Sequence, residues 1–138
     1  MKKYIYLAGP IAGCTQEEAT EWREYICTFF PHGIVGISPL RCEPLKEGMT
    51  YTEPGATEKK WSDPRAIATK NWLDTESCDL VLAYLPKELN ERRPSYGTTI
   101  EIGWAIGLRK PLIVVSDDDY LMNQKRNLGD TIVNAKKE

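Results

Sequence analysis

The chain has 138 residues, of which 41% are hydrophobic and 28% charged, and its formal net charge is −2. These values are typical of a single globular domain, residues 1–138, that buries a core of its own. The near-neutral charge argues against a nucleic-acid polymer as partner, and no apolar run approaches the roughly 20 residues of a membrane helix. The short apolar stretch after Lys2 and Lys3 breaks at Gly9-Pro10, too early for a secretory leader.

Predicted strands and helices alternate along the chain. In order, they are the strand 3–8, the helix 15–30, the strand 34–37, the helix 64–77, the strand 79–85, the helix 98–109 and the strand 111–115. Thr15 and Glu18 form a capping-box pattern at the start of the first helix. Residues 41–63 follow no regular pattern and predict a functional loop or lid. Residues 86–97 predict a polar loop, and the polar tail after Ser116 has room for a short helix.

This alternation predicts an α/β fold with a parallel sheet of about five strands joined by right-handed crossovers. Ligands bind such sheets at the carboxyl ends of the strands. Gly9-Pro10, residues 38–41 and the loop 86–97 are therefore expected around one crevice. The first loop, Gly9–Gly13, contains neither a dinucleotide fingerprint nor a P-loop, so neither a dinucleotide nor ATP is expected as a cofactor.

The cysteines and the histidine are too scattered to predict a metal site. No C-x-x-C pair occurs among Cys14, Cys27, Cys42 and Cys78, and His32 is the only histidine. Reduced thiols of a cytoplasmic protein are the simplest interpretation. A catalytic triad would have to use His32, which lies in a predicted turn. An enzyme of this composition is expected to work with carboxylates, hydroxyls and backbone groups.

The segment from Ser95 to Ala105 is the most informative one, and it allows two interpretations. In the first, Thr98 and Glu101 form a capping box, with Gly97 as the turn before it. In the second, Glu101 faces the crevice as a nucleophile or base, beside the N–H donors of a helix N-terminus. The two are partly compatible, because a glutamate in the first turn is held in place by its own helix.

A second polar cluster contains Asn71, Asp74 and Asp79. Asn71 and Asp74 are three residues apart, so they share one face of the predicted helix. The simplest interpretation is that Asp74 is a solvated helix charge and that Asp79 is a turn residue at the start of a strand.

Several short segments are each weak indicators of a family, but their order along the chain makes the set more specific than any single segment. They are Ile5–Pro10, Ser38–Arg41, Asn71-x-x-Asp74, Ser77–Ala83, Ser95-x-Gly97-Thr98-x-x-Glu101–Ala105 and Lys110-Pro111. Together they resemble the nucleoside 2-deoxyribosyltransferase family. The resemblance covers residues 4 to about 115.

The resemblance implies a flavodoxin-like, doubly wound sheet and an enzyme that needs no metal or other cofactor. The family cleaves the N-glycosidic bond of 2′-deoxynucleosides and transfers the sugar to another nucleobase through a deoxyribosyl ester. By this resemblance Glu101 is the nucleophile and Tyr6 orients it by a hydrogen bond. A carboxylate that stabilises and then traps an oxocarbenium ion is the chemistry of retaining glycosidases.

The resemblance also implies residues that contact the substrate. In this chain they are Gly9, Pro10, Asn71, Asp74, Ser95, Gly97 and Thr98. The family completes each site with a neighbouring subunit, so a homo-oligomer, at least a dimer, is expected, with Asn123 and Asn127 as candidate contributors. Trp61 and Trp72 are candidates for a subunit interface or for stacking on a base, although packing is the commoner role of a tryptophan in such a segment. The expected partners are thus a nucleoside or nucleotide and a free nucleobase.

Two departures from the family pattern keep other functions open. Asn71 stands where the transferases usually have a base-contacting aspartate, and an amide is a poor general acid. Asp74 or a water would then supply the proton, or the base preference would differ. Without an acid, a non-catalytic nucleotide-binding domain is a third possibility.

The other departure is Ser95, where well-known transferases carry an acidic residue. Related N-glycosidases of deoxynucleoside 5′-monophosphates have a serine there that contacts the phosphate. Arg41, Arg92 and Arg93 are candidates for further phosphate contacts. Against this, those hydrolases have a phosphate-binding serine in the first loop, where this chain has Pro10. Hydrolysis of nucleotides is therefore the second hypothesis.

Overall fold

The fold is built on one parallel sheet. The computed structural model describes residues 1–41, 43, 45–51, 53, 56–57, 63–123 and 132–134. The strands are β1 (Lys3–Ala8), β2 (Ile34–Ile37), β3 (Leu80–Tyr84), β4 (Leu112–Ser116) and the three-residue β5 (Ile132–Asn134). Their order is β2-β1-β3-β4-β5, and every pair is parallel. This is the flavodoxin-like order of a doubly wound sheet, which confirms the predicted fold class.

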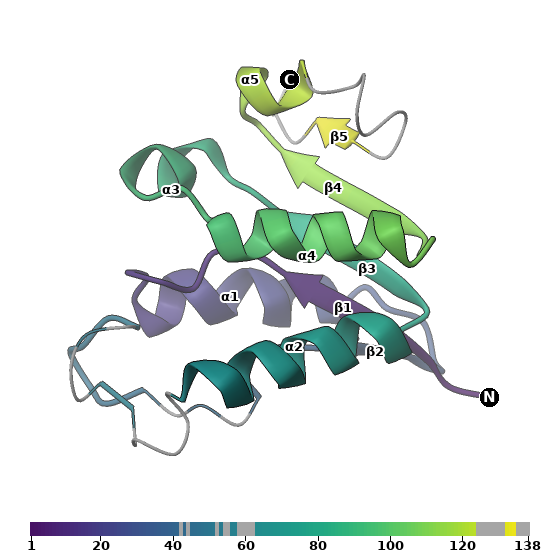
Figure 1. Cartoon of the computed structure of the whole chain (residues 1–138), viewed down its shortest axis with the longest axis horizontal. Helices are drawn as coiled ribbons and strands as arrows, with labels where there is room; N and C mark the ends of the chain where they lie inside the picture. The colour runs from purple at the N-terminus through teal and green to yellow at the C-terminus, as the bar shows by residue number, and fades with distance from the viewer. Residues whose placement is uncertain are drawn as a thin grey trace.

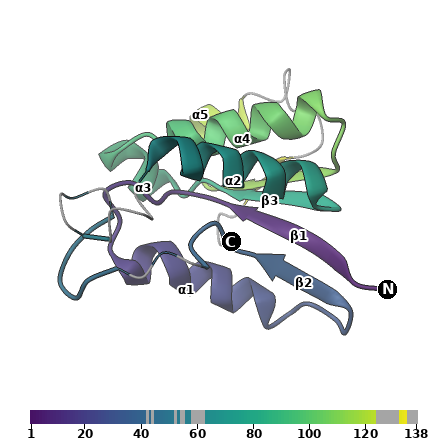
Figure 2. The same cartoon turned by 60° about the horizontal axis from the view of Figure 1, so that its bottom comes forward.

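Helices cover both faces of the sheet. They are α1 (Gln16–Cys27), α2 (Pro64–Ser77), α3 (Lys87–Arg92), α4 (Tyr96–Gly107) and α5 (Asp119–Met122). Figures 1 and 2 show α2 and α4 side by side on one face and α1 on the opposite face. Among the described residues, no helix is long and apolar enough to cross a membrane.

The core lies between the central strands and α4. Consecutive residues of β1 and β3 are buried, as expected for strands that are covered on both faces. Tyr6, Val81 and Val114 are fully buried, and they pack with Ile102 and Ala105 of α4 in one cluster. This packing fixes α4 against the sheet, and the carboxyl ends of β1 and β3 are held side by side because Ala8 pairs with Ala83.

Local sequence signals explain where two helices begin. The capping box of α1 is confirmed: Glu18 N–H donates to the Thr15 hydroxyl, and Thr15 N–H donates to the Glu18 carboxylate. α2 has the predicted bounds, with Pro64 in its first turn and the Asp63 side chain as its N-cap.

Three predicted boundaries are wrong. α1 ends at Cys27 rather than at residue 30, and Phe29 beyond its end is 65% exposed. The predicted loop 86–97 contains α3, a helix of one and a half turns that polar residues conceal from pattern analysis. α4 begins at Tyr96 rather than at 98, so Thr98 lies inside the helix.

Candidate active site

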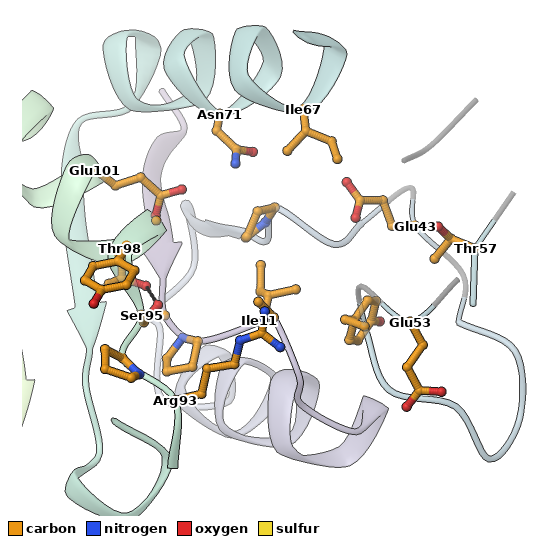
Figure 3. A pocket seen from close by; sticks show the side chains of 18 residues that line it. Ile11, Glu43, Glu53, Thr57, Ile67, Asn71, Arg93, Ser95, Thr98 and Glu101 are labelled. Atoms are coloured by element: carbon orange, nitrogen blue, oxygen red, sulfur yellow. Dashed lines mark hydrogen bonds between the residues drawn. The ribbon is translucent and has the colours of Figure 1, made fainter. Parts of the chain in front are cut away.

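A pocket of about 600 Å³ opens at the carboxyl edge of the sheet, a volume typical of small-molecule sites. The predicted residues that line it are Gly9, Pro10, Asn71, Ser95, Gly97, Thr98 and Glu101. They come from the β1–α1 loop, from α2 and from the start of α4. The sheet topology therefore brings together the segments that the sequence placed around one crevice (Figure 3).

Glu101 and Tyr6 form a buried pair at one end of this pocket. The Tyr6 hydroxyl donates a hydrogen bond of 2.9 Å to Glu101 Oε1. Tyr6 on β1 is 0% exposed and Glu101 on α4 is 7% exposed. The alternative capping-box interpretation is wrong, because Ser95 is the N-cap of α4 and Glu101 lies in its second turn. The carboxylate is held by the sheet and not by its own helix end.

The environment of this pair sets its protonation. Burial raises the pKa of Glu101 to about 7, and the Tyr6 hydrogen bond and the charge of Arg23 act in the opposite direction. Burial, followed by the charge of Glu101, raises the pKa of Tyr6 far above its ordinary value. Tyr6 therefore remains a phenol that donates its proton, and Glu101 changes its charge near neutral pH.

Arg23 of α1 is a functional candidate that sequence reasoning missed. It is 2% exposed. Its Nε and Nη2 donate hydrogen bonds of 3.1 Å to the carbonyls of Leu7 and Gly9, and Nη1 donates to the Ala19 carbonyl. The guanidinium also lies 4.4 Å from the centre of the Trp22 ring. Arg23 thus holds the backbone that leads into the pocket. An arginine in an amphipathic helix is usually solvated, so no sequence signal distinguishes it.

The wall beside Glu101 carries hydroxyl groups. Ser95 Oγ and Thr98 Oγ1 lie 2.6 Å apart at the first turn of α4. Thr98 is 2% exposed, whereas Ser95 is half-buried and faces the pocket. A Cβ at Gly97 would meet no atom within 4 Å, so packing within the described chain does not require glycine there.

On α2, Asn71 and Asp74 have different surroundings. Asn71 reaches the pocket, and its buried Oδ1 has no hydrogen-bond partner among the described residues. Asp74 lies outside the pocket lining and accepts two hydrogen bonds, of 2.7 and 2.8 Å, from Arg41. The structure therefore brings Asn71, but not Asp74, to the predicted site.

The other two candidate arginines, Arg92 and Arg93, differ in their ion pairing and in their position relative to the pocket. Arg92 pairs with Glu18 at 2.8 Å, but Arg93 lines the pocket and its guanidinium has no ion pair or hydrogen bond with any residue described. Asp79 accepts hydrogen bonds from Tyr4 N–H and the Lys3 ammonium at the start of β3, which supports its interpretation as a structural residue.

Two further candidates, Asn123 and Trp72, are not among the described residues that line the pocket. Asn123 follows α5 and is exposed. Trp72 packs edge-on against Trp104 of α4, with ring centres 5.2 Å apart. Asn127 and Trp61 lie outside the described residues.

Residues of the irregular segment 41–63 form one wall of the pocket, and the sequence alone did not indicate which of them would do so. Glu43, Tyr51, Glu53 and Thr57 line the pocket. Figure 3 shows Glu43, Glu53 and Thr57 on the side away from Glu101. The segment is tied to the first loop by backbone hydrogen bonds, from Gly13 N–H to the Tyr51 carbonyl and from Tyr51 N–H to the Cys14 carbonyl. No group of three or more His, Cys, Asp or Glu side chains that could hold a metal ion occurs in the described part of the chain.

A parallel α/β fold with a buried carboxylate at its carboxyl-edge pocket defines a small-molecule-binding domain of the doubly wound class. The chain belongs to the nucleoside 2-deoxyribosyltransferase family, whose model matches residues 5–135. A 2-deoxyribosyltransferase from Leishmania mexicana has a similar solved structure, with a TM-score of 0.59 and 22% sequence identity. The match covers 84% of this chain and 65% of that one. No curated protein matches the sequence.

Proposed function

We propose that this protein cleaves the N-glycosidic bond of 2′-deoxynucleosides and transfers the deoxyribosyl group to another nucleobase, with Glu101 as the nucleophile. The observation that carries the proposal is the buried Glu101 carboxylate, which accepts a hydrogen bond from Tyr6 and borders a pocket large enough for a nucleoside. Membership of the family supports the same reaction class.

The chemistry follows from the charge that develops on the sugar. As the C1′–N bond breaks, C1′ gains oxocarbenium character, and a carboxylate beside it stabilises that charge and then forms an ester. An acceptor base attacks C1′ in the second step and releases Glu101. Tyr6 has a positioning role, because its donated hydrogen bond fixes the oxygen that it binds and leaves the other one free to react.

The substrate contacts are assigned by position. Thr98, Ser95 and Gly97 border the Glu101 end of the pocket and are proposed to contact the sugar, while Asn71 is proposed to contact the base. Gly9 and Pro10 form the floor next to β1. We also propose that the enzyme works as a homo-oligomer, as its family resemblance implies, in which Asn123 reaches a neighbouring site. Sedimentation equilibrium tests the oligomer, and a monomer at assay concentration contradicts it.

A second candidate function is hydrolysis of deoxynucleoside 5′-monophosphates. The specific observation in its favour is Arg93, a cation without a partner among the described residues, in the same pocket as the Ser95 hydroxyl. A guanidinium and a hydroxyl at a helix N-terminus attract phosphate, whereas an acidic side chain would repel it.

One experiment separates the candidates. The protein is incubated with deoxyinosine and adenine, and separately with dIMP or dCMP, and the bases are followed by HPLC. Base exchange supports the transferase. Base release from the monophosphates alone supports the hydrolase, and binding without turnover supports a nucleotide-binding domain. A mass increase equal to one deoxyribosyl group (deoxyribose less one water) on Glu101, absent in Glu101→Ala, tests the covalent step.

A further inference from the structure

The leaving base needs a proton, and none of the groups assigned so far supplies it. When Glu101 attacks C1′, the electron pair of the C1′–N bond moves onto the base, which leaves as an anion unless a ring nitrogen is protonated. Tyr6 already donates its proton to Glu101. Asn71 is an amide without an acidic proton. Asp74 lies outside the pocket lining.

Among the described residues, the carboxyl groups that line the pocket are those of Glu43, Glu53 and Glu101. Glu53 is exposed, and hydrogen bonds from the Thr50 hydroxyl and N–H lower its pKa, so it holds a proton poorly. Glu43 lies on the wall opposite Glu101, with its carboxylate turned toward the pocket and with Asn71 and Ile67 between the two glutamates (Figure 3). In the proposed reaction the sugar lies at Glu101, and the base would then lie across the pocket, on the side of this wall.

The surroundings of Glu43 suit a group that gives and takes back a proton. Its side chain is 13% exposed, and its Oε1 lies 3.8 Å from Lys70 Nζ, which also donates a hydrogen bond to the Pro39 carbonyl. Burial raises the pKa of Glu43, and the Lys70 charge acts against that rise. Among the described residues, the other titratable group that interacts with Glu43 is Tyr51, whose pKa is raised by burial and by the Glu43 charge.

We propose that Glu43 is the proton donor to the leaving base and the proton acceptor for the incoming one, a role that rests on the proposed transfer reaction. In the first step a Glu101 oxygen bonds to C1′, the C1′–N bond breaks, and the Glu43 proton passes to a base ring nitrogen. In the second step the acceptor base loses its N–H proton to Glu43 as its nitrogen attacks C1′ and the ester bond breaks. After the second step Glu101 is again a free carboxylate and Glu43 is again protonated.

Asn71 complements this role by orienting the base. It reaches the pocket between the two glutamates, and an amide presents both a donor and an acceptor to a base edge. Its Oδ1 has no partner among the described residues, so a base N–H is a fitting donor to it. The base is thereby held with a ring nitrogen toward Glu43.

The test compares a leaving group that needs a proton with one that does not. Nicotinamide 2′-deoxyriboside and 7-methyl-2′-deoxyguanosine carry cationic bases that leave neutral without protonation. We expect Glu43→Gln to lower the single-turnover rate of base release from the neutral deoxynucleoside that the wild type uses best by about 100-fold or more. The single-turnover rate of base release from the cationic substrates, measured without an acceptor base, should change less than about threefold. Glu43→Asp, which keeps the acid, should recover part of the lost rate, and Glu47→Gln on the same exposed loop is the charge-matched control.

The outcomes distinguish this role from the reaction itself. A wild-type enzyme that transfers no deoxyribose contradicts the proposed function. An active wild type whose Glu43→Gln variant keeps its single-turnover rate of base release from neutral substrates, or changes only in KM, overturns the role of Glu43 alone. An equal loss of that rate on neutral and cationic substrates also overturns it. Because a misfolded variant would show such a loss, its circular dichroism and thermal unfolding are compared with those of Glu47→Gln.

Discussion

The Tyr6 hydroxyl meets the Glu101 carboxylate across 95 positions of sequence, at 2.9 Å, in a place where neither side chain has appreciable contact with solvent. Such a bond to a charged group is stronger than a neutral one, and a buried carboxylate that loses it is left poorly satisfied.

Tyr6→Phe tests this relationship directly. We expect kcat to fall by about tenfold or more, because a charge-assisted hydrogen bond contributes roughly 1.5–3 kcal/mol. Since the Tyr6 bond lowers the pKa of Glu101, the acid limb of the pH–kcat/KM profile should lie at higher pH in the variant than in the wild type. Tyr4→Phe, on the same strand with an exposed ring, is the control. A Tyr6→Phe profile that matches the control contradicts the positioning role.

Glu101→Gln should abolish turnover and yet stabilise the fold at alkaline pH. The folded-state pKa of about 7 lies above the ordinary value of 4.5, so folding favours the protonated form. The stability that this proton contributes is fully present below about pH 4.5 and is lost as the pH rises through 7. The variant should therefore match the wild type at pH 4.5 and exceed it at pH 8 by up to about 3 kcal/mol. Urea unfolding at the two pH values measures this, with exposed Glu21→Gln as control.

Arg23→Met should weaken both the fold and the site. Three backbone carbonyls lose their donor, so we expect a loss of about 1–3 kcal/mol in the free energy of unfolding. The Arg23 charge also lowers the pKa of Glu101, so the acid limb of activity should move to higher pH. Arg65→Met on the exposed start of α2 provides the comparison. An unchanged acid limb would limit Arg23 to a purely structural role.

Gly9→Ala should destabilise the protein and reduce turnover, because an alanine Cβ would lie 2.5 Å from the Trp22 ring and 3.2 Å from the Tyr84 carbonyl. Gly103→Ala in α4 is the matched substitution, since a Cβ there meets nothing within 4 Å and alanine favours helix by up to about 1 kcal/mol. Thermal unfolding should separate the two variants in opposite directions. A stable, fully active Gly9→Ala variant contradicts the close approach.

The sequence predicts the parts of this structure in which local patterns and packing agree. The apolar runs of β1 and β3 and the capping box of α1 are strong local signals, and the parallel topology then places Glu101 at the same edge as Gly9. Where the outcome depends on distant partners, the pattern misleads. Thr98 and Glu101 have the spacing of a capping box, but the Tyr6 hydroxyl competes for the carboxylate and the helix begins earlier.

Two candidate functional residues, Arg23 and Glu43, were not predicted from the sequence, and the proposed role of each depends on its burial in the tertiary structure. Arg23 and Glu43 have ordinary charged side chains in polar stretches of sequence. Only the folded chain places the first over Trp22 and the second in a pocket wall. Arg41 is the opposite case. The sequence suggested it as a phosphate contact, but in the structure its guanidinium donates two hydrogen bonds to the Asp74 carboxylate.

The pocket wall that contains Glu43, Tyr51, Glu53 and Thr57 is attached to the first loop by main-chain hydrogen bonds. Tyr51 is joined to Gly13 and Cys14 through main-chain atoms alone, so these two bonds do not depend on which side chains the segment carries. Apart from Glu43, the proposed proton donor, the residues that line the pocket from this wall can therefore be exchanged while the anchor and the nucleophile stay in place. Directed evolution of Tyr51, Glu53 and Thr57 should then alter which nucleobase is accepted while the proposed chemistry is kept.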